Sequence, residues 1–254
     1  MLALLFALAA ALTVSDSAIQ EAFHGHPGAF VLLDCAAHET FRSDAAACAE
    51  KVPPCSTFKI WNTAIGLETG EVRDPDAPFW KWDGTKREIE AWNRDQTLRS
   101  AFAVSCVPAY QNLARHIGKE RMQKWLDTIG YGDRNLSAGI DIFWLPEPGR
   151  QALLISPDQQ AAMLGKLVDG ELPFSATTRA TLKSVMKVKT TAHGTLFGKT
   201  GTGTAEKYNW AWFVGYVESS GKTFAFACLL KDQGLMGTDA RAAVESILTA
   251  QGLL

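Results

Sequence analysis

A serine and a lysine that stand three residues apart form the most reactive arrangement in the sequence, Ser56-Thr57-Phe58-Lys59. In a helical segment this spacing places the hydroxyl and the amine on one face, where they can touch. A serine becomes a useful nucleophile when a neighbouring base removes its proton. The helix N-terminus adds backbone N–H groups that stabilise a developing negative charge. Taken alone, the pattern more often marks a helix cap and a surface lysine.

A second reactive arrangement, Lys199-Thr200-Gly201, stands near the end of a predicted strand over 195–199. Glycine lets a ligand approach the backbone closely, while lysine and threonine supply a cation and a hydroxyl. A serine and lysine at this spacing, followed after a long interval by Lys-Thr-Gly, form the pattern shared by penicillin-binding proteins and serine β-lactamases. The combination is far more specific than either half.

The elements that must position these residues follow from hydrophobic patterning. Strand patterns occupy both ends of the sequence, at 29–35, 38–42, 195–199, 210–218 and 223–230. Helical patterns fill the middle and close the chain, at 56–67, 97–129 with breaks at Pro108 and Gly118, 156–168, 177–187 and 240–250, and a polar excursion covers 74–95. Strands joined by short turns favour antiparallel pairing. We therefore expect an α/β fold of the α+β type, in which one antiparallel sheet built from both chain ends is flanked by terminal helices. A mostly helical second region stands beside the sheet, and the cleft between the two is the expected site.

Length and charge place the chain among ordinary globular proteins. Its 254 residues are 47% apolar, which is enough for one well-buried domain. The formal net charge of -2 gives no global field that would attract nucleic acid or anionic lipid. Residues 1–12 are apolar but too few to span a bilayer, and small residues follow at Ser15 and Ser17. We interpret residues 1–17 as a signal peptide that leaves a single domain, 18–254, without a membrane span. Residues 1–17 lack the basic residues that normally begin a signal peptide. A truncated sequence and a buried N-terminal helix therefore stay open as alternatives.

The five cysteines are an odd number, so at least one thiol stays free or pairs between chains. Cys35, Cys48 and Cys55 are near enough in sequence for a bridge, although spacing does not define pairing. Cys106 and Cys228 stand in apolar contexts and are expected to be buried small hydrophobes. We find no zinc signature among the five histidines, and no metal is predicted.

The sequence resembles the class D (oxacillinase-type) serine β-lactamases across nearly the whole predicted mature chain. The matching segments, in order, are 54–60 (PCSTFKI), 65–70 (IGLETG), 105–107 (SCV), 131–133 (YGD), 141–145 (DIFWL), 199–201 (KTG) and 212–215 (WFVG). The segment 105–107 has the pattern S-x-V where penicillin-binding proteins have S-x-N. This pattern, together with the F-W-L segment at 143–145, is typical of class D in particular. The resemblance implies the fold described above and hydrolysis of β-lactams, penicillins first, through an acyl-serine.

The resemblance also assigns a base. Ser56 would be the acylated nucleophile and Lys59 would be carboxylated by carbon dioxide to a carbamate, with no other cofactor. Only a neutral amine reacts with carbon dioxide, and an unperturbed lysine is only about 0.1% neutral at physiological pH. Burial can lower a lysine pKa by about 3 units or more. The match places Phe58, Val107, Trp144 and Leu145 around the amine, and the indole N–H of Trp144 would hold the carbamate.

Further positions are carried over in the same way. Ser105 would relay a proton to the leaving nitrogen beside Lys199, and the backbone N–H groups of Ser56 and Thr202 would form the oxyanion hole. The substrate carboxylate would be received by Lys199, Thr200 and Arg241. Substrate contacts would also involve the matched positions Tyr131, Val107, Leu145 and Gly201.

Two departures from the family pattern stand out. Asp133 replaces the usual asparagine and is expected either to pair with Lys199 or another cation, or to repel an anionic substrate. Trp61 replaces a proline found in many relatives and has no interpretation. The range of substrates, carbapenems included, is not visible in the sequence.

Three alternatives remain open at this point. The penicillin-sensor domains of signalling receptors share the fold and motif order but acylate once and stop; they are tethered by additional membrane spans. A cell-wall transpeptidase is disfavoured by S-x-V and by the compact domain. An inert relative is the third. We expect an exported bacterial enzyme, periplasmic or secreted, monomeric or homodimeric, whose partner is a small-molecule β-lactam and not nucleic acid.

Overall fold

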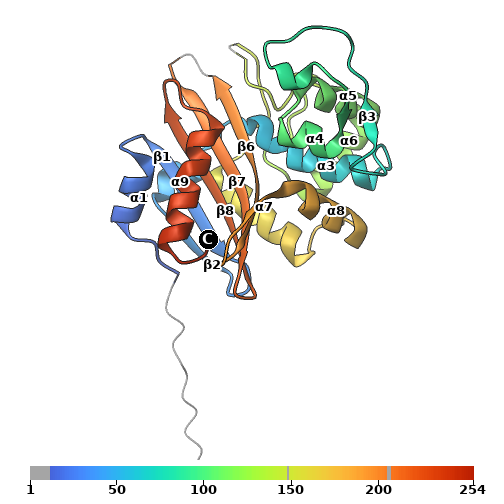
Figure 1. Cartoon of the computed structure of the whole chain (residues 1–254). Coiled ribbons are helices and arrows are strands. Elements are labelled where there is room, and N and C mark those ends of the chain that lie inside the picture. Colours follow the sequence, from blue (N-terminus) through green and yellow to red (C-terminus); the bar gives the residue numbers. More distant parts are fainter. Residues whose placement is uncertain (1–11, 148, 205–206) are drawn as a thin grey trace, which may run out of the picture.

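One antiparallel sheet organises the protein (Figure 1), whose computed structural model describes residues 12–147, 149–204 and 207–254. The strand order is β2-β1-β8-β7-β6-β5. These strands are β1 (Gly28–Asp34), β2 (Glu39–Arg42), β5 (Lys187–Thr190), β6 (Thr195–Thr204), β7 (Asn209–Ser219) and β8 (Lys222–Asp232). Because β1 pairs with β8, the two ends of the sequence meet inside one sheet, as predicted.

The terminal helices cover one face of this sheet, where α1 (Asp16–Phe23) packs beside α9 (Gly237–Ala250). Side chains alternate between the faces of a strand, and β8 shows this period of two. Phe226 and Cys228 face the core under α9, whereas Ala225, Ala227 and Leu229 belong to the core on the opposite face. The small residues on that second face leave room for the helices that pack there.

The helical region lies against the second face and beyond its edge (Figure 1). It contains α2 (Ala45–Ala49), the 3₁₀ turn η1 (Cys55–Phe58), α3 (Lys59–Glu68), the 3₁₀ turn η2 (Glu90–Trp92), α4 (Leu98–Ala103), α5 (Val107–Ile117), α6 (Lys119–Ile129), α7 (Pro157–Asp169) and α8 (Ala176–Met186). A two-stranded sheet of β3 (Pro78–Trp80) and β4 (Gln96–Thr97) joins the ends of the polar excursion. The predicted fold class is thereby confirmed.

Helix boundaries were predictable where capping residues mark them. The Ser156 hydroxyl accepts a hydrogen bond from the Gln159 N–H at 3.2 Å, and Pro157 opens α7, as predicted. The prediction of a break at Pro108 was wrong by a few residues. Pro108 lies in the first turn of α5, where its missing N–H is tolerated, and the chain breaks before it, between α4 and α5.

Three other predictions need correction. The strand over 195–199 extends to Thr204, because β7 pairs along its whole length, so Lys199-Thr200-Gly201 lies within the strand and not at its end. The helix over 177–187 ends at Met186 because Lys187 pairs with Phe197 and begins β5. All five cysteines are buried free thiols, so the suggested bridge among Cys35, Cys48 and Cys55 does not form.

The predicted leader, 1–17, lies mostly outside the described residues, which begin at Leu12. Ser15 caps α1 by accepting a hydrogen bond from the Ala18 N–H at 3.2 Å, and Val14 is buried. Leader cleavage stays a prediction. Within the described ranges, the helices fall short of the length and apolar character needed to cross a bilayer.

Candidate active site

The Ser56 hydroxyl and the Lys59 amine meet where η1 runs into α3. Lys59 Nζ donates a hydrogen bond to Ser56 Oγ at 2.8 Å, which confirms the contact predicted from their spacing. Cys55, just before the serine, has a φ of 52°, a left-handed conformation that is strained for a residue with a side chain. The turn thus holds Ser56 at the front of the helix while the lysine reaches it from the first helical turn.

The Lys59 amine lies in a closed apolar niche, and its side chain is 0% exposed. Burial lowers the pKa of Lys59 well below its ordinary value, and the positive charge of nearby Lys199 lowers it further. The Tyr110 ring lies 5.5 Å from Nζ, and Phe58 and Trp144 are buried as predicted. A neutral amine beside a hydroxyl is an arrangement that can accept a proton or react with an electrophile.

Trp144 is held beside this niche by its own loop. Its ring stacks on Phe58 with centroids 5.8 Å apart, and the neighbouring Phe143 carbonyl accepts a hydrogen bond from the Leu153 N–H at 2.8 Å. Asp141 ties the loop to α5 through an ion pair with Arg115 at 2.6 Å. The indole Nε1 of Trp144 is buried without a hydrogen-bond partner among the described residues. A buried donor without an acceptor is costly, so this atom is suited to an acceptor group that the niche takes up.

Strand β6 approaches the Ser56 turn so closely that glycine is required. A Cβ atom at Gly201 would lie 3.0 Å from the Thr57 side chain and 3.1 Å from the Pro54 carbonyl oxygen. A Cβ atom at Gly203 would lie 2.5 Å from the Cys55 sulfur. The two glycines therefore let β6 bring Thr202 close to the Ser56 turn, where the resemblance expects the second oxyanion donor. The Thr202 hydroxyl accepts a hydrogen bond from the Gly237 N–H at 2.8 Å.

Lys199 is also buried, with 4% of its side chain exposed. Burial lowers its pKa from 10.5 to about 7, so its charge changes near neutral pH. Nζ donates to the Thr200 carbonyl oxygen at 3.0 Å and lies 5.6 Å from the Phe102 ring. Two buried amines, Lys59 and Lys199, thus share one low-dielectric region, and the charge of Lys199 disfavours the charged form of Lys59.

Ser105 lies in the connection between α4 and α5 with a φ of 53°. Its neighbour Phe102 places it near the site, because the Phe102 ring lies 5.6 Å from Lys199 Nζ. Strained backbone at a reactive position is common where a fold fixes a side chain for chemistry. Trp92, which the sequence did not single out, supports this connection by donating from its indole to the Val104 carbonyl at 2.9 Å.

The open edge of β6 forms a cavity of about 200 Å³ that is lined by Lys199, Thr200 and Arg241. The structure thus brings together the three residues assigned to the substrate carboxylate. Arg241 Nε donates to Glu245 one helical turn later, at 2.7 Å. Val107 and Leu145 are half-buried, Val107 at the start of α5 and Leu145 beside Trp144.

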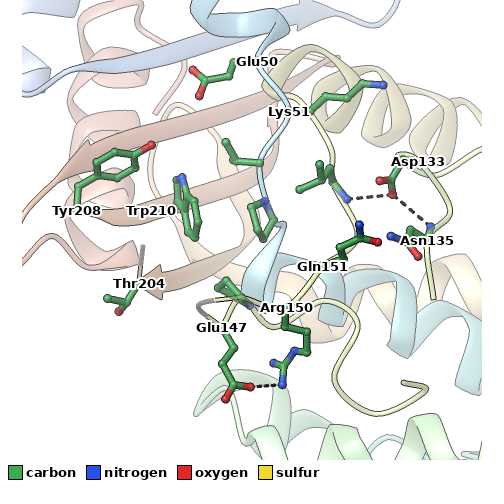
Figure 2. Close-up of a pocket in the computed structure, with 15 residues that line it drawn as sticks. Glu50, Lys51, Asp133, Asn135, Glu147, Arg150, Gln151, Thr204, Tyr208 and Trp210 are labelled. Carbon is green, nitrogen blue, oxygen red and sulfur yellow. Dashed lines mark hydrogen bonds and ion pairs between the residues drawn. The ribbon is translucent and has the colours of Figure 1, made fainter. Parts of the chain in front are cut away.

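A larger cavity of about 630 Å³ lies between the segment before Ser56, the loop after Trp144 and the end of β6 (Figure 2). None of Ser56, Lys59, Lys199 or Ser105 lines it, so size does not identify the reactive site here. Asp133 belongs to this cavity, and its carboxylate accepts hydrogen bonds from the N–H groups of Leu154 at 3.1 Å and Asn135 at 3.2 Å (Figure 2). The expected ion pair of Asp133 needs correction, since within the described ranges its carboxylate contacts backbone N–H groups and no cation, and it ties two loops together. Repulsion of an anionic substrate by Asp133 stays a prediction.

Tyr131 lies in the interior instead of lining the cleft. Its side chain is 0% exposed, its hydroxyl donates to Gln160 at 3.3 Å, and Trp61 packs on its ring with centroids 5.3 Å apart. Gln160 in turn donates to the Thr57 hydroxyl at 2.9 Å. The structure therefore replaces the predicted substrate contact with a supporting position behind the nucleophile turn, and it gives Trp61 a packing partner.

We expect Tyr131→Phe to lower the free energy of unfolding by about 1 kcal/mol, because one buried hydrogen bond is lost. Chemical denaturation measures this change, and KM for a penicillin should stay the same. A raised KM with unchanged stability would restore the direct substrate contact.

Residues 28–250 match the family described as the penicillin binding protein transpeptidase domain. The chain is 39% identical over 243 residues to "Probable beta-lactamase YbxI" of Bacillus subtilis (strain 168), covering 96% of this chain and 88% of that protein. The structure titled "Crystal Structure of Beta-lactamase class D from Bacillus subtilis" superimposes with a TM-score of 0.87 at 39% identity, over 96% of this chain and 99% of that one. The "C-terminal domain of the Bacillus licheniformis BlaR penicillin-receptor" also gives a TM-score of 0.87, at 29% identity, over 93% of this chain and 95% of that one.

Fold and site therefore define a penicillin-recognising transpeptidase-type domain with an active serine. Within this class, the chain belongs to the class D serine β-lactamase family, and as a member it is a serine hydrolase of β-lactams.

Proposed function

We propose that the enzyme hydrolyses penicillins, and cephalosporins as a second group, through an acyl-Ser56 intermediate with a carboxylated Lys59 as general base. One observation carries the proposal, namely a fully buried amine whose Nζ lies 2.8 Å from the serine hydroxyl. Burial lowers the pKa of that amine and so favours its neutral form, which is the form that reacts with carbon dioxide.

The niche around Lys59 fits a carbamate. Its walls are apolar, and Trp144 offers a buried indole N–H that lacks an acceptor among the described residues. When present, the carbamate supplies a carboxylate-like base of moderate pKa next to Ser56, which suits proton transfer at neutral pH better than an amine does. These features support the modification, and dissolved bicarbonate is its source.

Each step of the reaction is then assigned to particular residues of the chain. Ser56 Oγ attacks the lactam carbonyl carbon and forms an ester as the carbon–nitrogen bond breaks, and its proton reaches the ring nitrogen by way of Ser105. The backbone N–H groups of Ser56 and Thr202 hold the oxyanion, and such donors contribute about 100- to 1000-fold in rate. Water afterwards cleaves the ester, which releases the ring-opened acid and restores the Ser56 hydroxyl.

Substrate charge supports penicillins as the first substrate class. They carry a carboxylate, and the cavity at the open edge of β6 presents Lys199, Thr200 and Arg241. Cation and hydroxyl donors lie together there beside β6, the strand that approaches the Ser56 turn, and a carboxylate prefers such an arrangement.

A penicillin sensor is the second candidate, because the sensor domain noted above superimposes as closely as the class D enzyme does. A sensor is acylated once and retains the adduct. The greater sequence identity to the enzymes favours turnover.

An assay with a chromogenic cephalosporin distinguishes the hydrolase from the penicillin sensor. The purified protein is mixed with this substrate in the presence and in the absence of bicarbonate. Many turnovers, stimulated by bicarbonate, support the proposed enzyme. A single stoichiometric burst with the adduct on Ser56 by mass spectrometry indicates the sensor, and no reaction indicates an inert relative.

We further propose that the enzyme is exported to the periplasm or the medium. The predicted leader, 1–17, and the bacterial origin of the relatives support this. Its partner is the small-molecule substrate.

A further inference from the structure

Arg241 is fixed by a charged network that joins α9 to β5. Its Nε donates to Glu245 Oε1 at 2.7 Å, and the other oxygen, Oε2, accepts from Lys189 Nζ at 2.6 Å. Burial alone would raise the pKa of Glu245, but the hydrogen bonds from Lys189 and Arg241 lower it overall. Glu245 therefore stays ionised and holds one cation from each element.

The geometry leaves the two terminal nitrogens of the Arg241 guanidinium available to a ligand. Glu245 occupies only the Nε edge, and both terminal nitrogens of Arg241 lack a hydrogen-bond partner in the described part of the chain. A guanidinium binds a carboxylate best when two N–H groups point at it together. Because Arg241 lines the same cavity as Lys199 and Thr200, an anchored Nε aims these two nitrogens along one direction.

Without an anchor, the long side chain would sample many rotamers, since 40% of it is exposed. Ordering an arginine side chain when a ligand binds is unfavourable by an amount that corresponds to about a tenfold change in affinity. Lys189 adds a second restraint, since it fixes Glu245 to β5, the strand whose first residue, Lys187, pairs with Phe197 just before the open edge of β6.

We propose that Glu245 is a positioning residue for substrate binding, which holds the Arg241 guanidinium in the orientation that receives the substrate carboxylate. Glu245 does not touch the substrate. The inference rests on the proposed function and adds to it a determinant of affinity for anionic substrates that acts through Arg241.

The test compares wild type and Glu245→Gln with benzylpenicillin and with its methyl ester, which lacks the charge. We expect KM for benzylpenicillin to rise about tenfold with little change in kcat, and KM for the ester to stay the same. In an Arg241→Ala background, Glu245→Gln should add nothing further. Glu218→Gln, which breaks the 2.6 Å ion pair to Lys183 at the other end of β6, is the matched control and should behave as wild type.

A fall in KM would overturn the proposal, because it would show that Glu245 competes with the substrate for Arg241. An equal effect on acid and ester, or a further effect without Arg241, would show a merely structural role. If wild type is acylated but does not turn over, the proposed hydrolysis fails by itself, and the same comparison is made on the acylation rate constant. Thermal melts confirm that each variant is folded.

Discussion

Replacing Lys59 by alanine is expected to lower kcat for penicillins by about 10²- to 10⁴-fold, the usual contribution of a general base. Ser56 stays in place, because its turn is fixed by strand β6 and by the Thr57 hydrogen bonds, so slow acylation should persist. Deacylation needs an activated water, so its rate constant should fall more than that of acylation. Steady-state kinetics with intact-protein mass spectrometry measures both steps, and the acyl adduct should accumulate.

Lys51→Ala is the matched control, since Lys51 is exposed and lies in the larger cavity, away from the serine. This variant should keep wild-type rates. If Lys59→Ala kept them as well, the assigned base would be wrong. A melting curve is needed beside the kinetics, because the substitution removes a fully buried side chain.

Trp144→Phe is expected to raise the bicarbonate concentration needed for half-maximal activity by about 10- to 100-fold. A hydrogen bond to a charged group is worth about 1.5–3 kcal/mol, and each 1.4 kcal/mol is a factor of ten. Phenylalanine keeps an aromatic ring against Phe58 but removes the indole N–H, so the carbamate should lose its donor while the niche stays apolar. Titration of activity with bicarbonate measures the shift, and saturating bicarbonate should restore most of the rate.

Trp125→Phe provides a comparison on α6, where the ring stacks on Phe174 with centroids 4.9 Å apart. Its bicarbonate requirement should equal that of wild type. An unchanged requirement in Trp144→Phe would show that the indole N–H does not hold the modification, and the fit of the niche to a carbamate would lose its main support.

Local rules explain which parts of the fold could be predicted. Ser156 and Pro157 define the start of α7 because capping depends on neighbours in the chain. The short turns between β6, β7 and β8 define an antiparallel arrangement for the same reason. The end of α8 does not follow from such local rules, since Lys187 joins a strand only because Phe197 of β6 lies opposite.

Within the site, the contacts of Tyr131 and Asp133 could not be predicted from neighbours in the chain. Their identities matched a family segment, yet the hydroxyl of Tyr131 lies against Gln160 and the carboxylate of Asp133 binds the N–H of Leu154. Both partners come from other parts of the chain. Sequence position therefore located these residues near the site without defining what they contact.

The sequence by itself predicted the contact of Ser56 with Lys59, because helical spacing brings two side chains together whatever surrounds them. It indicated the class of enzyme through the resemblance of its ordered motifs to the class D family. Only the tertiary structure decided that the pKa of the lysine is lowered. The pKa of a buried amine depends on the loss of water around it and on nearby charge. The Tyr110 ring covers Lys59 and the charge of Lys199 acts on it, and both residues lie far from Lys59 along the chain. The two contacts that anchor Arg241 show the same difference. The contact with Glu245 follows from helical spacing, because Glu245 lies one helical turn after Arg241, whereas Lys189 reaches Glu245 only through the packing of β5.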